Sequence, residues 1–110
     1  MNPEDMAFTL EAGDGVVRPR GELDLATAGL VRAALQKQAG EHGRVTLDLG
    51  GLLFLDTSGL RMVLETADAS RREGFEFVVL PGVPEIQRLF DLAGVTGMVP
   101  FANGGEPPGR

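Results

Sequence analysis

Four consecutive residues, Asp56-Thr57-Ser58-Gly59, carry the most chemically informative side chains of the chain. A carboxylate and two hydroxyl groups stand between an apolar run and a segment with helical periodicity, so they belong at the start of the predicted helix. Asp, Thr and Ser are preferred helix N-caps, and capping alone would explain them. A helix start also favours negative charge, which would suit an anion or a phosphorylated hydroxyl. From the residues alone both alternatives stay open.

Two further acidic residues, Glu22 and Asp24, lie in the segment Gly21-Glu22-Leu23-Asp24. This segment is predicted to be part of a loop over residues 21–25. Asp24 precedes a run with helical periodicity, so it is expected to be the N-cap of that helix.

Composition excludes several kinds of function. The chain has 110 residues and a formal net charge of −6, which disfavours nucleic acid and anionic membranes as direct partners. Without cysteine, and with His42 as its only histidine, it is expected to hold no metal and no cofactor. Apolar runs such as residues 52–55 are far shorter than the ~20 residues that a bilayer requires. The expected location is therefore the cytoplasm.

Catalytic alternatives fit the residues poorly. An aspartic protease needs two carboxylates that share a proton, and here Ser58 intrudes before the glycine. A Ser-His-Asp hydrolase would depend on His42, which lies in a Gly-flanked loop. A two-component receiver needs an acidic pair after its first strand and a lysine near its end, whereas this chain has Ala12-Gly13-Asp14 and only Lys37. The chain is therefore expected to have no catalytic residues.

The first elements needed to position the site are two strands. Alternating apolar residues predict strands at 7–11 and 16–20, and the turn signal at 13–15 predicts that they form a hairpin. Pro19 cannot donate a backbone hydrogen bond, so it is expected at a strand terminus or sheet edge.

Three amphipathic helices are predicted after the hairpin. Each has one apolar stripe, and together the stripes comprise Leu30, Val31, Ala34, Leu35; Leu60, Val63, Leu64, Ala67; and Ile86, Leu89, Phe90, Ala93. Met62 falls off the second stripe and is expected to be exposed. Arg61 with Glu65, and Asp68 with Arg72, have the i,i+4 spacing of helical ion pairs.

The remaining apolar runs predict strands at 45–49, 52–55, 75–80 and 98–101, and the unbroken run at 52–55 is typical of a strand covered on both faces. The fold class is therefore α/β: a mixed β-sheet with an N-terminal hairpin, covered on one face by the three helices. Residues 1–6 are expected to be flexible and residues 103–110, rich in Gly and Pro, to be disordered.

Three segments together resemble a known family: Gly21-Glu22-Leu23-Asp24, residues 55–60, and PEIQRLFDLAG at 84–94. They resemble the STAS domain of bacterial anti-sigma factor antagonists, over residues 7–101 within a predicted domain at 7–102. The resemblance implies a phosphorylation-switched binding module that sequesters an anti-sigma factor with serine/threonine kinase activity and so frees a sigma factor. A phosphatase would reset it. The alternative is a STAS module of a stress-signalling or lipid-transport complex.

Site residues follow from the same resemblance. Thr57 corresponds to the phosphoacceptor, with Ser58 as the alternative. The implied partner-binding residues are Glu22, Asp24, Asp56, Ser58, Gly59, Arg61 and Met62. Thr57 departs from the family's more usual Ser. Arg61 departs from a usual Gly, and it could pair with a phosphate or with Glu65.

Overall fold

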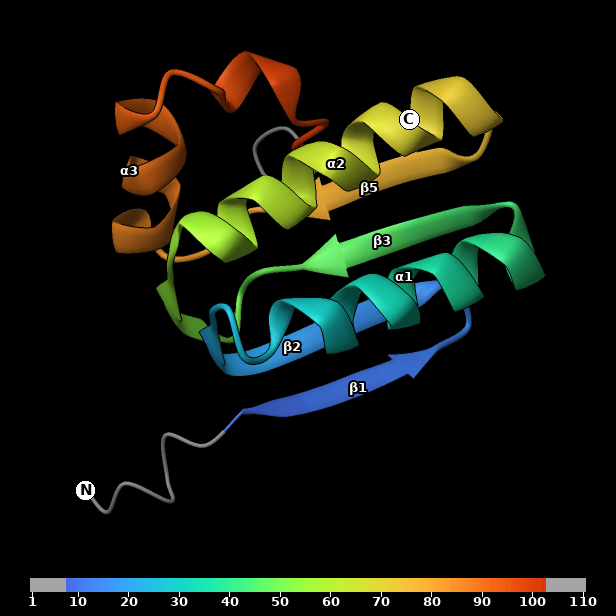
Figure 1. Ribbon diagram of the computed structural model, residues 1–110, viewed down its shortest axis with the longest axis horizontal. Coiled ribbons are helices and arrows are strands. Elements are labelled where there is room, and N and C mark those ends of the chain that lie inside the picture. The colour runs from blue at the N-terminus through green and yellow to red at the C-terminus, as the bar shows by residue number, and fades with distance from the viewer. Residues whose placement is uncertain (1–7, 103–110) are drawn as a thin grey trace.

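A computed structural model describes residues 8–102 and contains a five-stranded mixed sheet with three α-helices (Figure 1). The elements in chain order are β1 (Thr9–Gly13), β2 (Val16–Leu23), α1 (Ala28–His42), β3 (Arg44–Asp48), β4 (Leu52–Leu55), α2 (Thr57–Glu73), β5 (Glu76–Leu80), α3 (Pro84–Leu92) and a short 3₁₀ helix (Thr96–Met98). The predicted α/β class is confirmed. The expectations for residues 1–6 and 103–110 lie outside the described residues.

The hairpin forms as predicted. Asp14 and Gly15 both have positive φ, 53° and 80°, as the tightest two-residue hairpin turn requires. β1 pairs antiparallel with β2, whereas the other strand pairs are parallel. The backbone N–H of Gly15 donates to the side-chain oxygen of Gln38 at 2.7 Å, and this buried contact ties the turn to α1.

β2 does not end at Pro19 but continues to Leu23. Its first part pairs with β3 at Val16 and Val17, and its last part pairs with β4 from Gly21 onward. Pro19 falls in the interval between these two ladders, where its missing N–H costs no ladder bond. Glu22 therefore lies on a strand rather than in the predicted loop.

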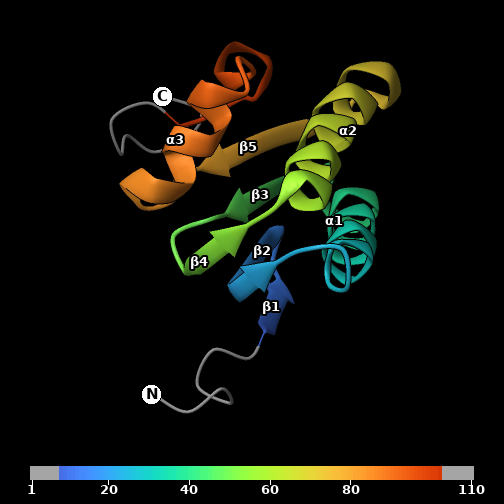
Figure 2. The same cartoon turned by 60° about the vertical axis from the view of Figure 1, so that its left-hand side comes forward.

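Two of the three helices form one layer, and α3 packs elsewhere on the sheet. α1 and α2 lie side by side on one face of the sheet (Figure 1), and in Figure 2 β5 runs between α2 and α3. α3 packs against β4 instead of joining the other two helices, contrary to the expectation that all three would cover one face. The core between the layers consists mainly of Val17, Leu23, Val31, Leu35, Val45, Leu47, Val63, Phe77 and Val79.

Met62 is fully buried, so its predicted exposure is wrong. The buried residues of α2 include Met62, Val63, Thr66 and Ala67, while Leu60 and Leu64 are half-buried. α2 packs against α1 as well as against the sheet, so its buried face is wider than the predicted stripe and includes Met62 and Thr66. Met62 is thus a core residue and leaves the candidate partner surface.

Other apolar positions are more exposed than predicted. Leu30 is 57% exposed because α1 buries the series Ala28, Val31 and Leu35 instead. Leu53 and Phe54 of β4 are also exposed, so this strand is not covered on both faces. The predicted strand at 98–101 is reduced to an isolated bridge between Phe101 and Val79.

Candidate functional site

Asp56 is the N-cap of α2, which confirms the capping role. Its Oδ1 accepts hydrogen bonds from the N–H groups of Ser58 at 2.8 Å and Gly59 at 3.1 Å. The N–H of Leu60 bonds to the Asp56 carbonyl at 3.0 Å. The first turn of α2 is therefore largely satisfied by Asp56 itself.

Asp56 also joins the loop after β2 to the start of α2. The N–H of Leu25 donates to its Oδ2 at 3.3 Å, and its own N–H donates to the carbonyl of Leu23 at 3.2 Å. These two bonds bring the acidic segment that contains Glu22 and Asp24 beside the hydroxyl residues of α2. The two motifs singled out in the sequence therefore meet at one place.

Asp24 does not cap α1, contrary to prediction. Its Oδ1 accepts from the N–H groups of Ala26 at 3.0 Å and Thr27 at 3.2 Å, so it closes the turn that precedes the helix. The N-cap position belongs to Thr27, whose hydroxyl donates to the carbonyl of Glu22 at 2.9 Å. Asp24 thus holds the shape of the acidic segment, while its side chain stays half-exposed.

Gly59 lets α2 approach the sheet closely. A Cβ atom at this buried position would lie 2.5 Å from Leu55 Cδ1 and 2.9 Å from both Leu23 Cγ and the Leu23 carbonyl oxygen. Such distances are far inside van der Waals contact, and the carbonyl belongs to a paired strand that cannot easily move. Gly59 therefore positions the start of α2 and is not itself available to a partner.

Thr57 and Ser58 differ in their surroundings. Neither hydroxyl has a hydrogen-bond partner among residues 8–102, but Thr57 is exposed whereas Ser58 is half-buried. Thr57 also borders a surface hollow of about 450 Å³ between α2 and α3. The other lining residues are Asp56 and the apolar Leu55, Leu60, Leu89, Leu92 and Ala93. The threonine hydroxyl thus stands at the edge of an apolar depression.

Two exposed leucines, one lining this depression and one beside Asp56, are not predicted by the sequence pattern. Leu92 of α3 is 71% exposed, and Leu25, whose N–H bonds to Asp56, is 80% exposed. Large exposed apolar side chains gathered at one site are typical of an interaction surface. Leu92 lies outside the predicted buried stripe of its helix. An apolar residue at such a position is the sequence signal for an exposed leucine.

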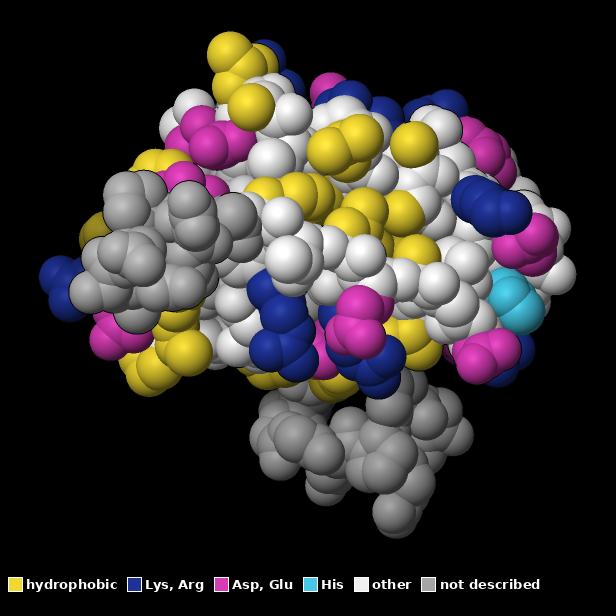
Figure 3. All heavy atoms as spheres, turned by 90° about the horizontal axis from the view of Figure 1, so that it is seen from below, with side chains coloured by type: hydrophobic (Ala, Val, Ile, Leu, Met, Phe, Trp, Pro, Cys, Tyr) yellow, Lys and Arg dark blue, Asp and Glu magenta, His cyan; other side chains and the backbone are white. Residues whose placement is uncertain are grey.

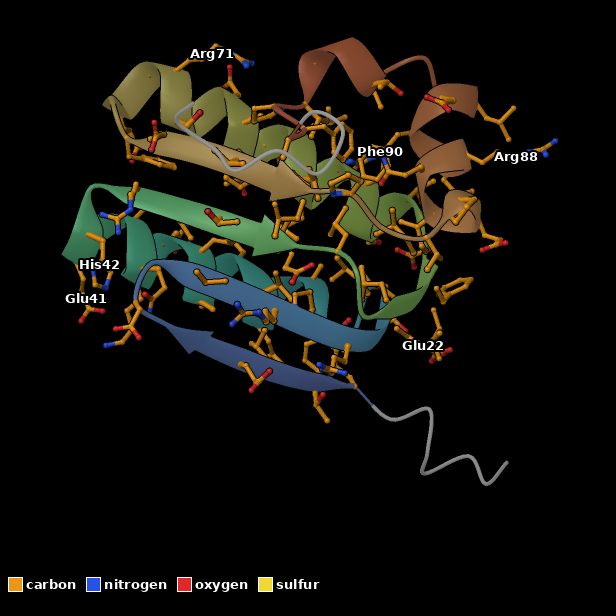
Figure 4. All side chains as sticks on the ribbon, turned by 180° about the vertical axis from the view of Figure 1, so that it is seen from behind. Glu22, Glu41, His42, Arg71, Arg88 and Phe90 are labelled. Carbon is orange, nitrogen blue, oxygen red and sulfur yellow. The ribbon has the colours of Figure 1, made fainter. Side chains whose placement is uncertain are left out.

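Charged residues flank the same end of the molecule. Glu22 is half-exposed, and Figure 4 shows it at the end of the sheet that also carries α3.

Arg61 is exposed, but its predicted pair with Glu65 is not formed, because Glu65 pairs with Arg32 of α1 at 2.9 Å. The predicted pair of Asp68 and Arg72 is present at 2.8 Å, and this hydrogen bond lowers the pKa of Asp68.

A second surface hollow, of about 530 Å³, lies between α1 and α2, and its lining includes Arg32, Glu65 and Arg72. Residues 8–102 contain no cluster of three or more His, Cys, Asp or Glu side chains suited to a metal ion. Within the same residues no helix combines the length and hydropathy that a bilayer-spanning segment needs. On the face shown in Figure 3, basic and acidic side chains are interspersed rather than gathered by sign.

Removing the Asp56 carboxylate tests its double role. Asp56→Ala loses the cap of α2 and the bond to Leu25, and is expected to lower the free energy of unfolding by about 0.5–2 kcal/mol. Urea unfolding followed by circular dichroism measures this difference. Asp56→Asn separates the two roles, since its amide oxygen still caps well while its NH2 group cannot accept the bond from Leu25. Equal stability of Asp56→Ala and the parent would contradict the role.

Known proteins share both the sequence pattern and the fold. The STAS domain family model matches residues 7–104. The chain is 35% identical over 90 residues to the anti-sigma F factor antagonist of Paenibacillus polymyxa, covering 78% of this chain and 75% of the relative.

Two solved structures agree with this assignment. An anti-sigma factor antagonist from Mycobacterium paratuberculosis superimposes with a TM-score of 0.72 at 26% identity, covering 93% of this chain and 89% of the other. The Bacillus cell fate determinant SpoIIAA in its phosphorylated form superimposes with a TM-score of 0.56 at 27% identity, covering 89% and 93%. Because the family model spans all of the described residues, the chain belongs to the STAS domain family.

Proposed function

We propose that this protein is an anti-sigma factor antagonist: it binds an anti-sigma factor and so frees a sigma factor for transcription. The observation that carries the proposal is the exposed Thr57 at the edge of an apolar hollow in a STAS domain, with a hydroxyl that has no hydrogen-bond partner within the described part of the chain. The names of its relatives support it, since the curated relative and the mycobacterial structure are both called anti-sigma factor antagonists. The protein would act in the cytoplasm, where sigma factors meet RNA polymerase.

The proposed switch is phosphorylation of Thr57 by the anti-sigma factor, which acts as a serine/threonine kinase. Thr57 is favoured over Ser58 because it is exposed and lines the hollow, whereas Ser58 is half-buried and does not line it. A relative of the same fold exists in a phosphorylated form, which supports a switch of this kind. The partner supplies ATP and the catalytic groups, and this chain supplies only the hydroxyl.

Release follows from desolvation in the proposed interface. A phosphothreonine carries about −1.5 to −2 charges at pH 7. If a partner covers the hollow formed by Leu60, Leu89 and Leu92, that charge would have to lose water against apolar side chains. Phosphorylation therefore opposes docking without a change in this domain, and a phosphatase restores binding by removing the charge.

The direct test of the function is a reconstituted release assay. Each ATP-binding anti-sigma factor of the source bacterium is purified in complex with its sigma factor, and the present protein is added. One of these complexes should dissociate, which is measured as sigma-dependent transcription from a cognate promoter. If none releases its sigma factor at saturating concentration, the proposed function is wrong.

The apolar hollow should contribute to partner affinity. Leu92→Asp places a charge on an exposed position of α3, so the fold should survive while affinity for the anti-sigma factor falls at least about tenfold, or ~1.4 kcal/mol. Titration calorimetry measures the affinity. The matched control is Met98→Asp, because Met98 is 55% exposed but does not line the hollow. Equal losses in both variants would show that the hollow has no special role.

A further inference from the structure

We propose that Arg61 is the intramolecular partner of a phosphoryl group on Thr57, and that the Arg32–Glu65 ion pair keeps Arg61 free for this role. The inference rests on the proposed function, because it takes Thr57 as the modified residue. It assigns a regulatory role to two arginines on different helices.

A phosphoryl group on Thr57 cannot rely on the N-terminus of α2. The N–H groups of Ser58 and Gly59 already donate to the carboxylate of Asp56. That carboxylate also carries a negative charge beside the new dianion. The backbone N–H groups that usually bind a phosphate at a helix start are therefore largely occupied by Asp56. The phosphate needs a positive charge from another residue.

Arg61 has the right spacing to supply that charge. It follows Thr57 by one helical turn, so the two side chains lie on the same face of α2. Its side chain is exposed and forms no ion pair among residues 8–102. A guanidinium can bind a phosphate through two parallel hydrogen bonds, which makes this pairing stronger than an ordinary one.

Glu65 would be the natural competitor for Arg61. It follows Arg61 by four residues, the spacing of a helical ion pair. In the structure its Oε1 instead accepts a hydrogen bond from Arg32 of α1 at 2.9 Å. Arg32 thereby holds Glu65 toward α1, so Glu65 does not pair with Arg61.

The other charged groups near Thr57 are mostly acidic. Asp56 precedes it, and Glu22 and Asp24 belong to the segment that Asp56 ties to α2. On α3, Asp91 bonds to the hydroxyl of Thr96, and Arg88 points away from the body of the molecule (Figure 4). These acids would raise the second pKa of the phosphate, whereas Arg61 would lower it. Removing Arg61 should therefore raise that pKa.

Phosphorus NMR tests the pairing without any partner protein. The full chain is prepared with phosphothreonine at position 57, and the second phosphate pKa, about 6 for such a group, is measured by pH titration. Arg61→Gln should raise this pKa by about 0.3–0.7 unit, as expected for one charge-assisted helical pair. Arg88→Gln is the control and should leave the pKa unchanged.

The role of the second arginine is tested with the same titration. Arg32→Gln frees Glu65 to pair with Arg61, so the phosphate pKa should rise, but by less than in Arg61→Gln. In the double variant Arg32→Gln/Glu65→Gln the pKa should return to the parent value. Circular dichroism confirms that each variant is folded.

An unchanged phosphate pKa in Arg61→Gln would overturn the proposal, and an unchanged value in Arg32→Gln would overturn the part played by Glu65. Because no anti-sigma factor is present, these outcomes are independent of the release assay. If no sigma factor is released in that assay, the proposed antagonist function is wrong, but the pairing of Arg61 with the phosphate can still be measured.

Discussion

Gly59→Ala is expected to lower the midpoint of thermal unfolding by about 5–15 °C, the equivalent of ~1–3 kcal/mol of overpacking in a domain of this size. The added methyl group would lie 2.5 Å from Leu55 Cδ1 and 2.9 Å from the Leu23 carbonyl oxygen. Either α2 moves away from the sheet or β2 and β4 distort. Both responses displace Thr57, since it lies in the same helical turn.

The matched control for this substitution is Gly40→Ala. Gly40 lies in α1, and a Cβ atom there would meet nothing within 4 Å. Alanine is favoured over glycine inside a helix by about 0.5–1 kcal/mol, so Gly40→Ala should unfold at the same temperature or higher. Differential scanning calorimetry compares the two variants. A Gly59→Ala protein as stable as the parent would mean that close approach at Gly59 does not position the site.

Thr57→Glu is expected to bind the anti-sigma factor at least about tenfold more weakly than the parent, a cost of ~1.4 kcal/mol. A carboxylate at this position must lose water against Leu60, Leu89 and Leu92 when a partner covers the hollow. Thr57→Ala lacks both the charge and the hydroxyl, so it should bind as well as the parent and resist release by ATP. Both variants should remain folded, because Thr57 is exposed.

Titration calorimetry with the purified anti-sigma factor measures these affinities, with Ser58→Ala as the matched control. Ser58 neighbours Thr57 but does not line the hollow, so its alanine variant should still be phosphorylated at Thr57 and released by ATP. If Thr57→Glu binds as tightly as the parent, Thr57 is outside the interface and the proposed switch is wrong.

Local signals in the sequence were sufficient for the elements that carry the site. The Gly13-Asp14-Gly15 turn predicted a hairpin because few other residues tolerate positive φ, and both Asp14 and Gly15 have it. The carboxylate before two hydroxyls predicted the start of α2, and Asp56 caps it through two N–H groups. In both cases the deciding interactions lie within four residues of one another.

Features that depend on packing between distant elements were not predictable in the same way. The periodicity of α2 alone predicts an exposed Met62, but α2 packs against α1 as well as the sheet and Met62 is buried. Arg61 was paired with Glu65 by spacing, yet Arg32 from α1 takes that carboxylate. A single helix's periodicity carries no information on its neighbours.

The hollow beside Thr57 was also not predictable from the sequence, because it too depends on packing between distant elements. It exists because α3 packs against β4 instead of joining α1 and α2, which leaves Leu89 and Leu92 beside the start of α2. The topology places residues about thirty positions apart at one surface, and amphipathic patterns alone do not specify which end of the sheet a helix covers.

The most direct test of the central claim is to locate the phosphoryl group itself. The parent protein is incubated with ATP and the anti-sigma factor identified by the release assay, and peptide mass spectrometry then assigns the modified residue. The account predicts one phosphoryl group on Thr57, with loss of the complex as modification proceeds. A phosphoryl group on Ser58, or release without any modification, would contradict it.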